Sequence, residues 1–359
     1  MNVAVDAMGG DYAPAAVVEG AVYAAREAGL AITLVGDEKR VLEELKKFPH
    51  DNLLITIKPA SDVIEMGESP SLALRRKKNS SIKVAMELVK SGEAAAVVSS
   101  GNTGAILASS IMILKPLKGI ERPTLASFLP TAKSGQMTIL VDAGANVDCK
   151  AHKLLQFGIM GHAYAQYILD KESPKIGLLS IGEEDNKGNE ASREAFQLFN
   201  RSGLNFIGNV EAKEVFRGTA DVLVCDGFTG NIALKIGESL AEMFISAIKG
   251  AFSRNLFSKM AYFFMKTPFQ ELKAKIDYSE YGGAPLLGIN GICIIGHGSS
   301  SSKAIKNAII LAARLAEKDL NARISQEITS RLGIQTVPGK KSAFLSWIRP
   351  YHQGEKENL

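Results

Sequence analysis

The chain has 359 residues, of which 46% are hydrophobic and 22% are charged, with a formal net charge of +4 at pH 7. This composition supports a large buried core and excludes wholesale disorder. The mild positive charge falls well short of a dedicated nucleic-acid binder. Three cysteines, Cys149, Cys225 and Cys293, lie far apart, which argues against a disulfide framework or a zinc site and indicates a reducing compartment.

The first hundred residues alternate strand and helix patterns. We predict strands at 2–6, 32–36, 53–57 and 95–99, and helices at 14–29, 37–48, from Pro70, at 81–91, and up to Leu114. Near the start, Asp6 and Asp11 interrupt the apolar run that a signal peptide requires, so we expect a cytoplasmic protein. The uncharged stretch 94–114 is long enough to cross a bilayer, but its central SSGNTG would leave polar groups in lipid. A strand, a turn and a buried helix explain it better.

The later half repeats the pattern. We predict strands at 138–142, 175–181, 220–225 and 291–295, each running through a glycine-bearing turn into a helix. Such alternation predicts an α/β protein with a mostly parallel sheet covered by helices on both faces. Residues 236–276 favour helix and predict a protruding arm. We therefore expect one α/β catalytic domain, residues 1–332 including the arm, followed by a C-terminal tail, 333–359.

Small residues gather after five of these strands, in SSGNTG (99–104), DAGAN (142–146), IGEEDNKGNE (181–190), CDGFTGN (225–231) and GHGSSSS (296–302). Ligands of open parallel sheets bind beyond the carboxyl ends of the strands. Free backbone N–H groups and helix dipoles at such turns attract phosphate. A single turn is explained equally well by turn formation and helix capping, whereas five turns on one edge favour a binding site.

Few ionisable or amide side chains in these turns suit catalysis. The chain lacks the glycine-rich nucleotide motifs, the H-E-x-x-H zinc motif and the G-x-S-x-G elbow. Lys187 is either a catalytic cation or a solvated loop lysine, and His297 is either a ligand-edge group or a structural histidine. Amide donors for an oxyanion or phosphate, each of which is equally a turn residue, are Asn102, Asn146, Asn189 and Asn231.

These turns, together with the opening MNVAVDAMGGDYAP and the run ALRRKKNSSI, resemble the bacterial phosphate acyltransferase family of phospholipid synthesis (the PlsX family) over roughly residues 1–332. The resemblance implies transfer of a long-chain fatty acyl group from acyl carrier protein to inorganic phosphate, which gives acyl phosphate. It also implies a homodimer with a fold like the isocitrate and isopropylmalate dehydrogenases. We expect no metal or other cofactor.

Residue roles follow from the resemblance and from the chemistry of the reaction. Because phosphate is already a competent nucleophile, we expect direct attack on the thioester, with Lys187, Asn231 and His297 as the catalytic residues. The expected phosphate or substrate contacts are Asp6, Gly10, Ser100, Gly101, Asn102, Thr103, Asn146 and Asn189. Alternatives are an acyl-coenzyme A donor, a decarboxylating dehydrogenase, and a non-catalytic membrane scaffold that recruits the carrier.

Two surfaces suggest partners. The run Arg75, Arg76, Lys77 and Lys78 is either a solvated helix face or a docking surface for the acidic carrier protein. In the arm, one helix side carries Leu256, Phe257, Met260, Phe263 and Phe264, with cations mostly opposite. That side suits an anionic membrane surface at the inner face of the cell membrane, or equally a partner arm in a dimer.

Overall fold

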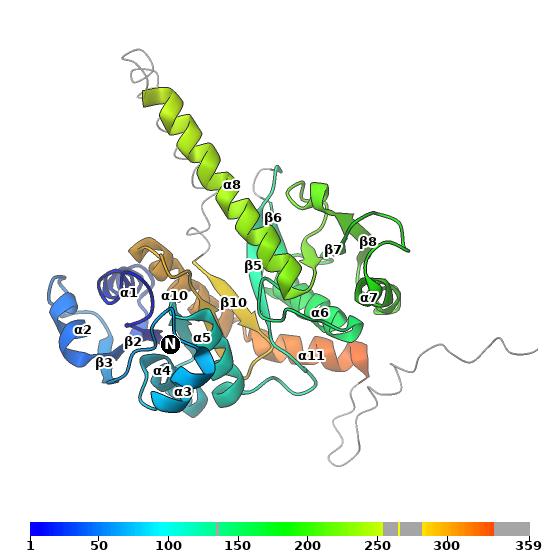
Figure 1. Ribbon diagram of the computed structural model, residues 1–359. Helices are drawn as coiled ribbons and strands as arrows, with labels where there is room; N and C mark the ends of the chain where they lie inside the picture. The colour runs from blue at the N-terminus through cyan, green and yellow to red at the C-terminus, as the bar shows by residue number, and fades with distance from the viewer. Residues whose placement is uncertain (134–135, 254–264, 266–281, 334–359) are drawn as a thin grey trace, which may run out of the picture.

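The computed structural model describes residues 1–133, 136–253, 265 and 282–333. Within them, eleven strands join into one sheet with helices packed on both faces (Figure 1), so the predicted α/β class is confirmed. The strands lie in the order β3-β2-β1-β4-β11-β10-β5-β6-β9-β7-β8. Their bounds are β1 Asn2–Asp6, β2 Ala31–Gly36, β3 Ile55–Pro59, β4 Ala96–Ser99, β5 Thr124–Pro130, β6 Met137–Val141, β7 Ile176–Ser180, β8 Phe206–Glu211, β9 Val222–Val224, β10 Ala284–Leu287 and β11 Ile292–Ile295.

The helices alternate with these strands along the chain. Their bounds are α1 Ala15–Ala28, α2 Glu38–Leu45, α3 Pro70–Arg76, α4 Ser81–Ser91, α5 Thr103–Ser109, α6 Ala151–Ile168, α7 Glu190–Asn200, α8 Gly227–Ser253, α10 Ser302–Glu317 and α11 Leu320–Leu332. A π-helical turn, η1 (Ser110–Leu114), continues α5, and a short 3₁₀ turn, η2 (Ala212–Glu214), follows β8.

Buried strands separate two hydrophobic cores. Successive side chains of a strand point to opposite faces, so Val3 and Val5 of β1 enter one core while Ala4 enters the other. Helices α1, α6, α10 and α11 contribute to the first core, and α3, α4 and α5 to the second. Burial on both faces explains why these strands are continuous apolar runs rather than alternating ones.

The parallel strands form two sets that run in opposite directions. One set is β3, β2, β1, β4 and β11, and the other is β6, β9, β7 and β8. Between them lie β10 and β5, which pair antiparallel with each other and with their outer neighbours. The glycine turns therefore leave the sheet in two directions, whereas the sequence analysis placed them on one edge.

The two sets of carboxyl ends nevertheless meet, because β10 has only four residues. Ile295, the last residue of β11, pairs with Ala284, while Leu125 of β5 pairs with Leu286, two residues further along β10. Val141, the last residue of β6, pairs with the next residue of β5, Ala126. Each residue adds about 3.3 Å along a strand, so these few residues of offset correspond to a short distance along the sheet. The carboxyl ends of the two opposed sets of strands therefore lie close together.

Most predicted elements are present, including all eight predicted strands. The stretch 94–114 contains β4, α5 and η1, as predicted. None of the helices in the described ranges combines the length and apolarity needed to cross a membrane. Strands β5, β8 and β10 were not predicted, because their sequences TLASFLP, FIGNVE and APLL are too polar, too short or too rich in proline to give a clear strand pattern.

The predicted arm starts earlier than expected. Helix α8 begins at Gly227, directly after β9, and continues to Ser253 as a projection from the body of the molecule (Figure 1). Its first turns therefore belong to the site and its later turns to the projection. The five expected membrane-contact residues, 256, 257, 260, 263 and 264, lie outside the described residues, as does the tail beyond Gly333.

Candidate active site

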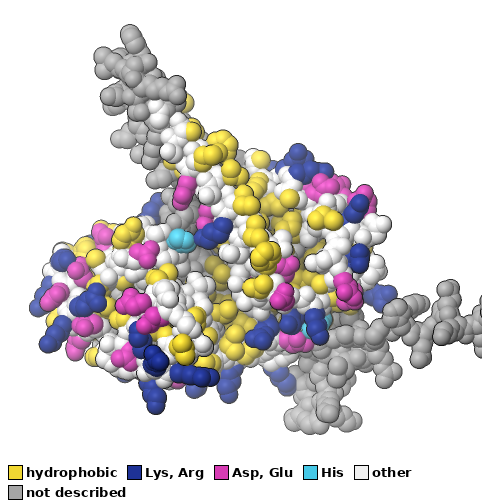
Figure 2. Space-filling view, in the orientation of Figure 1, with side chains coloured by type: hydrophobic (Ala, Val, Ile, Leu, Met, Phe, Trp, Pro, Cys, Tyr) yellow, Lys and Arg dark blue, Asp and Glu magenta, His cyan; other side chains and the backbone are white. Residues whose placement is uncertain are grey.

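A cleft of about 580 Å³ opens where the two sets of strands meet. Side chains of β5 and β10 line it between the sets. The turns after β1, β4 and β11 contribute Asp11, Thr103, Gly104, His297 and Gly298, and the opposite wall contributes Ala143, Gly144, Asn231, Lys235 and Glu238. Figure 2 shows acidic, basic and histidine side chains together near the base of the projecting helix. The cleft is thus built from both halves of the sheet, and each half contributes charged or polar side chains to a lining that also contains apolar residues.

Close packing of three turns shapes the first wall. Gly10 has a φ of +111°, and a Cβ there would lie 3.1 Å from the Gly298 carbonyl oxygen, which accepts the Asp11 N–H at 2.8 Å. A Cβ on Gly296 would lie 2.1 Å from Ser100 Oγ. The Ser100 side chain is buried, and its hydroxyl makes no hydrogen bond with any described residue. Glycine at these positions lets the turns approach closely enough to form one surface.

Asp6 supports these turns from beneath. Its carboxylate accepts hydrogen bonds from Ser99 Oγ at 2.6 Å and from the Met8 N–H at 3.2 Å. Burial raises the pKa of the Asp6 carboxyl, and the hydrogen bonds around it oppose that rise. Asp6 and Gly101 line a small void of about 10 Å³ and do not line the cleft. The structure therefore gives Asp6 a supporting position rather than a place on the cleft wall.

Asn102 is likewise committed to structure. Its Oδ1 accepts the Ala105 N–H at 3.0 Å, which caps α5, and its Nδ2 donates to the Met66 and Glu68 carbonyl oxygens at 2.8 and 3.0 Å. These bonds fix the loop before α3 against the turn. The exposed Thr103 is the residue of the predicted 99–104 turn whose hydroxyl side chain lines the cleft.

The DAGAN loop forms part of the opposite wall. Asp142, a residue that sequence analysis did not single out, is fully buried, and Asn146 donates from Nδ2 to its Oδ2 and to the Pro123 carbonyl oxygen, both at 2.8 Å. Burial raises the pKa of Asp142, and the surrounding N–H donors oppose that rise. Asn146 therefore holds the loop in place, and Ala143 and Gly144 form its surface toward the cleft.

The first turns of α8 supply the functional side chains of this wall. Asp226 stabilises the helix start by accepting hydrogen bonds from the Thr229 N–H at 2.8 Å and its Oγ1 at 3.0 Å. Asn231 and Lys235, one helical turn apart, line the cleft together, and Lys235 Nζ lies 2.7 Å from Glu238 Oε2. Lys235 was missed, although the i, i+4 spacing from Asn231 would have placed it on the same helix face.

His297 lies across the cleft, as expected from its place after β11. Its Nδ1 accepts the Ser299 N–H at 3.3 Å and lies 2.8 Å from Ser299 Oγ. A neutral imidazole that accepts through Nδ1 carries its proton on Nε2. The exposed ring is thus oriented by its own turn, with Nε2 as the proton-bearing atom.

Lys187 and Asn189 lie elsewhere. The loop that holds them borders a second cavity, of about 900 Å³, which Asn189 lines. Asn189 Oδ1 caps α7 by accepting the Ser192 N–H at 2.8 Å, while the exposed Lys187 lines neither cavity. The structure thus brings Thr103, Asn231 and His297 together but leaves Lys187 outside the cleft, so its catalytic role stays a prediction.

The predicted basic run divides in two. Lys77 Nζ pairs with the Glu68 carboxylate at 2.6 Å and lowers the pKa of that carboxyl, so it is committed locally. Arg75, Arg76 and Lys78 are exposed at the end of α3. The helix starts beside the cleft, because a Cβ on Gly104 would lie 2.6 Å from Pro70 Cγ. Helix α3 has seven residues, and each adds 1.5 Å along the helix axis, so the cations at its far end lie about 10 Å from that wall.

Metal ligands are not grouped in the part of the chain that the structure describes, where no set of three His, Cys, Asp or Glu side chains is placed to hold an ion. Of the three cysteines, Cys149 and Cys293 have their pKa raised to about 12 by burial, so their thiols remain neutral near physiological pH.

Solved structures share this fold. A phosphotransacetylase from Streptococcus pyogenes superposes with a TM-score of 0.61 at 20% identity, covering 89% of this chain and 94% of the other. A 4-hydroxythreonine-4-phosphate dehydrogenase from Klebsiella pneumoniae gives a TM-score of 0.51 at 14% identity, over 88% and 99% of the two chains. Enzymes with the predicted dehydrogenase-like fold and the transacylases therefore share one architecture with this protein.

Sequence comparison is more specific. Residues 1–323 match the model of the family described as "Fatty acid synthesis protein". The chain is 50% identical over 328 residues to the phosphate acyltransferase of Geotalea uraniireducens, covering 91% of this chain and 94% of the relative. Its counterpart from Pelotomaculum thermopropionicum is 48% identical over 339 residues, which cover 94% and 97% of the two chains.

These matches define the class of the protein as an acyltransferase of the α/β transacylase architecture. The chain belongs to this fatty acid synthesis family, and the relatives that it resembles at about 50% identity are phosphate acyltransferases. The family resemblance predicted from the sequence is therefore confirmed.

Proposed function

We propose that the chain transfers a long-chain fatty acyl group from acyl carrier protein to inorganic phosphate and so supplies acyl phosphate for phospholipid synthesis. The names of its relatives support phosphate as the acceptor, and the family description supports a fatty acyl substrate. The observation that carries the proposal is the convergence of Asn231, Lys235 and His297 in one cleft. A cation, an amide donor and an imidazole N–H donor suit attack by phosphate on a thioester, because they stabilise the charge that develops on the oxyanion and on the leaving thiolate.

The reaction proceeds by direct attack. A phosphate oxygen forms a bond to the thioester carbonyl carbon, and the carbonyl electrons move to oxygen to give a tetrahedral oxyanion. When the carbonyl re-forms, the carbon–sulfur bond breaks and the thiolate leaves. Lys235 offsets the phosphate charge, and Asn231 Nδ2 donates a hydrogen bond to the oxyanion. His297 donates a hydrogen bond from Nε2–H to the departing thiolate, which takes up the proton that the attacking hydrogenphosphate loses as it becomes acyl phosphate. We retain Lys187 as a proposed second cation for the phosphate or oxyanion charge, although its side chain lines neither cavity.

Carrier binding is assigned to Arg75, Arg76 and Lys78. These exposed cations suit an acidic protein, and α3 connects them to the cleft wall. Arg76→Glu should weaken carrier binding at low salt, measured by surface plasmon resonance, whereas Arg40→Glu on α2 should not. Equal binding by Arg76→Glu and the wild type, or wild-type binding insensitive to salt, would place the contact elsewhere.

Assembly and membrane attachment are assigned to the projection. Leu240, Met243 and Phe244 expose 44–59% of their surface on the outer part of α8, an arrangement that suits a homodimer. The residues proposed for peripheral contact with anionic membranes lie further along the chain, at 256–264. Analytical ultracentrifugation of Met243→Glu and sedimentation of Phe263→Glu with anionic liposomes test the two assignments separately. A dimeric Met243→Glu variant, or unchanged liposome binding by Phe263→Glu, would refute the corresponding assignment.

The decisive experiment compares acyl donors. The protein is incubated with phosphate and either palmitoyl-acyl carrier protein or palmitoyl-coenzyme A, and acyl phosphate and free thiol are measured together. We expect equal amounts of both products and faster reaction with the carrier. A faster reaction with palmitoyl-coenzyme A would identify coenzyme A, not the carrier protein, as the donor. Thioester loss without phosphate, or a trapped acyl-enzyme, would refute direct attack. Carrier binding without turnover would support the non-catalytic scaffold instead.

A further inference from the structure

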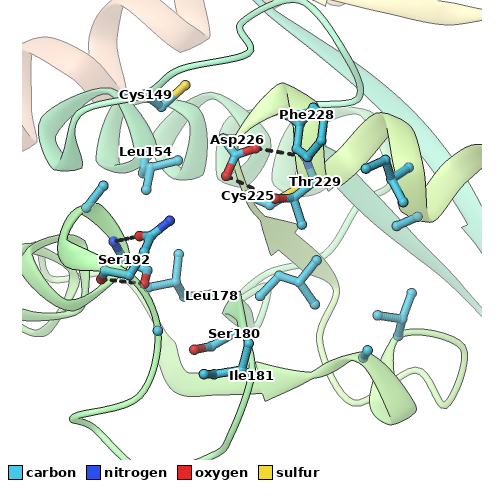
Figure 3. Close-up of a pocket in the computed structure, with 18 of the residues that line it drawn as sticks. Cys149, Leu154, Leu178, Ser180, Ile181, Ser192, Cys225, Asp226, Phe228 and Thr229 are labelled. Atoms are coloured by element: carbon cyan, nitrogen blue, oxygen red, sulfur yellow. Dashed lines mark hydrogen bonds between the residues drawn. The ribbon is translucent and has the colours of Figure 1, made fainter.

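The larger cavity has no role in the reaction described above. It lies between the end of β7, the start of α7 and the first turns of α8, with a volume of about 900 Å³ (Figure 3). Aliphatic and aromatic side chains dominate its lining, among them Leu154, Leu178, Ile181, Phe228, Ile232 and Ile236. This volume falls within the range of cavities that enclose small ligands.

The charges of the lining disfavour an anionic ligand. Among the described residues, its only charged members are Asp148 and Asp226, both acidic, and the Asp226 carboxylate is occupied by hydrogen bonds from Thr229. Asn189 and Ser192 are likewise bonded to each other through Asn189 Oδ1 and the Ser192 N–H. Figure 3 shows these polar pairs bonded within the wall. Apart from Asp148 and the Ser180 hydroxyl, which makes no hydrogen bond with any described residue, what remains is an apolar surface suited to an uncharged hydrocarbon group.

The cavity and the catalytic cleft share one wall. On α8, Asn231 lines the cleft while its neighbour Ile232 lines the cavity. In the loop between β6 and α6, Gly144 lines the cleft and Val147, three residues later, lines the cavity. A carbonyl held beside Asn231 is therefore separated from the apolar cavity only by the first turns of α8 and this loop.

We propose that this cavity receives the hydrocarbon chain of the acyl group while its carbonyl reacts in the cleft. The proposal rests on the proposed function, because it assigns a site to part of that substrate. The acyl chain leaves the cleft beside Asn231, where the two cavities border the same first turns of α8, and lies among the side chains of β7 and α8. Chain-length preference then depends on the depth of the cavity, which sequence analysis did not address.

The first test fills the cavity. Ala191 at the start of α7 and Ala212 in η2 line different walls. Ala191→Trp and Ala212→Trp should each lower kcat/KM for a palmitoyl donor about tenfold, equivalent to excluding about two methylenes from apolar surroundings, and leave a butyryl donor within about twofold. Ala322→Trp, the same change at an exposed position of α11 outside both cavities, is the matched control.

The second test needs no variant. Butyl-, hexyl-, octyl- and decylphosphonate carry a phosphate-like head on chains of increasing length. Their affinities for the wild type, measured by calorimetry, should rise about fourfold per methylene until the cavity is full. A flat series, or equal loss of butyryl and palmitoyl transfer in both tryptophan variants, overturns the chain site. If the tryptophan variants change their sedimentation but keep the chain-length preference of the wild type, the cavity is a contact surface for a second copy of the chain, and the proposed chain site is wrong. If the wild type transfers no acyl group from any donor, the proposed function itself is refuted.

Discussion

Asp142 offers the sharpest test of how the site is held together. This buried carboxylate receives five hydrogen bonds: Oδ1 accepts the N–H groups of Leu125, Gly144 and Ala145 at 3.0–3.2 Å, and Oδ2 accepts the N–H and Nδ2 of Asn146 at 2.7 and 2.8 Å. Asp142→Asn keeps one oxygen for the first three donors. The NH2 group of the new asparagine replaces Oδ2 and faces the two Asn146 donors. Because an NH2 group cannot accept a hydrogen bond, those two hydrogen bonds cannot form.

Each buried hydrogen bond left unmade costs about 1–3 kcal/mol, so two of them predict a loss of about 2–6 kcal/mol in the free energy of unfolding. That is a large share of the 5–15 kcal/mol typical of a folded protein. Because Ala143 and Gly144 line the cleft, the same change should lower kcat/KM for acyl transfer.

Urea denaturation followed by circular dichroism measures the effect as a fall in the midpoint at constant slope. Asp148→Asn, an exposed position six residues further along the chain, serves as the control and should stay within about 0.5 kcal/mol of the wild type. An Asp142→Asn variant as stable as this control would refute the assignment of the carboxylate as the support of the loop.

Three further predictions concern the cleft. Asn231→Ala should lower kcat about a hundredfold with little change in the KM for phosphate, as steady-state kinetics would show, because an oxyanion donor acts mainly in the transition state; a change in KM alone would contradict this role. Lys235→Met should raise the KM for phosphate more than Lys235→Arg does, and equal values in the two variants would exclude a charge effect. Gly296→Ala should reduce kcat/KM at unchanged secondary structure, since its Cβ would displace the Ser100 hydroxyl, and full activity would show that this packing is unimportant.

Local patterns in the chain predicted much of this protein. The apolar runs of β1, β4, β6 and β11 identify buried parallel strands, because strands covered on both faces need no polar alternation. The helix predicted at 37–48 begins at Asp37, whose Oδ1 caps α2 by accepting the Arg40 N–H at 3.0 Å. Helix periodicity and capping are local properties, so the residues that generate them lie close together in the chain.

The candidate site depends on contacts that no local pattern encodes. Asn102 and Asn146 have the composition of ligand donors, yet their side chains are used to fix loops distant in sequence, which only the folded chain reveals. Lys235 and the opposing turn of His297 meet because the short β10 brings the ends of two opposed sets of strands together. Residue type therefore determined which chemistry is available, whereas tertiary structure decided which groups face one cleft, since strand direction and register are set by long-range pairing.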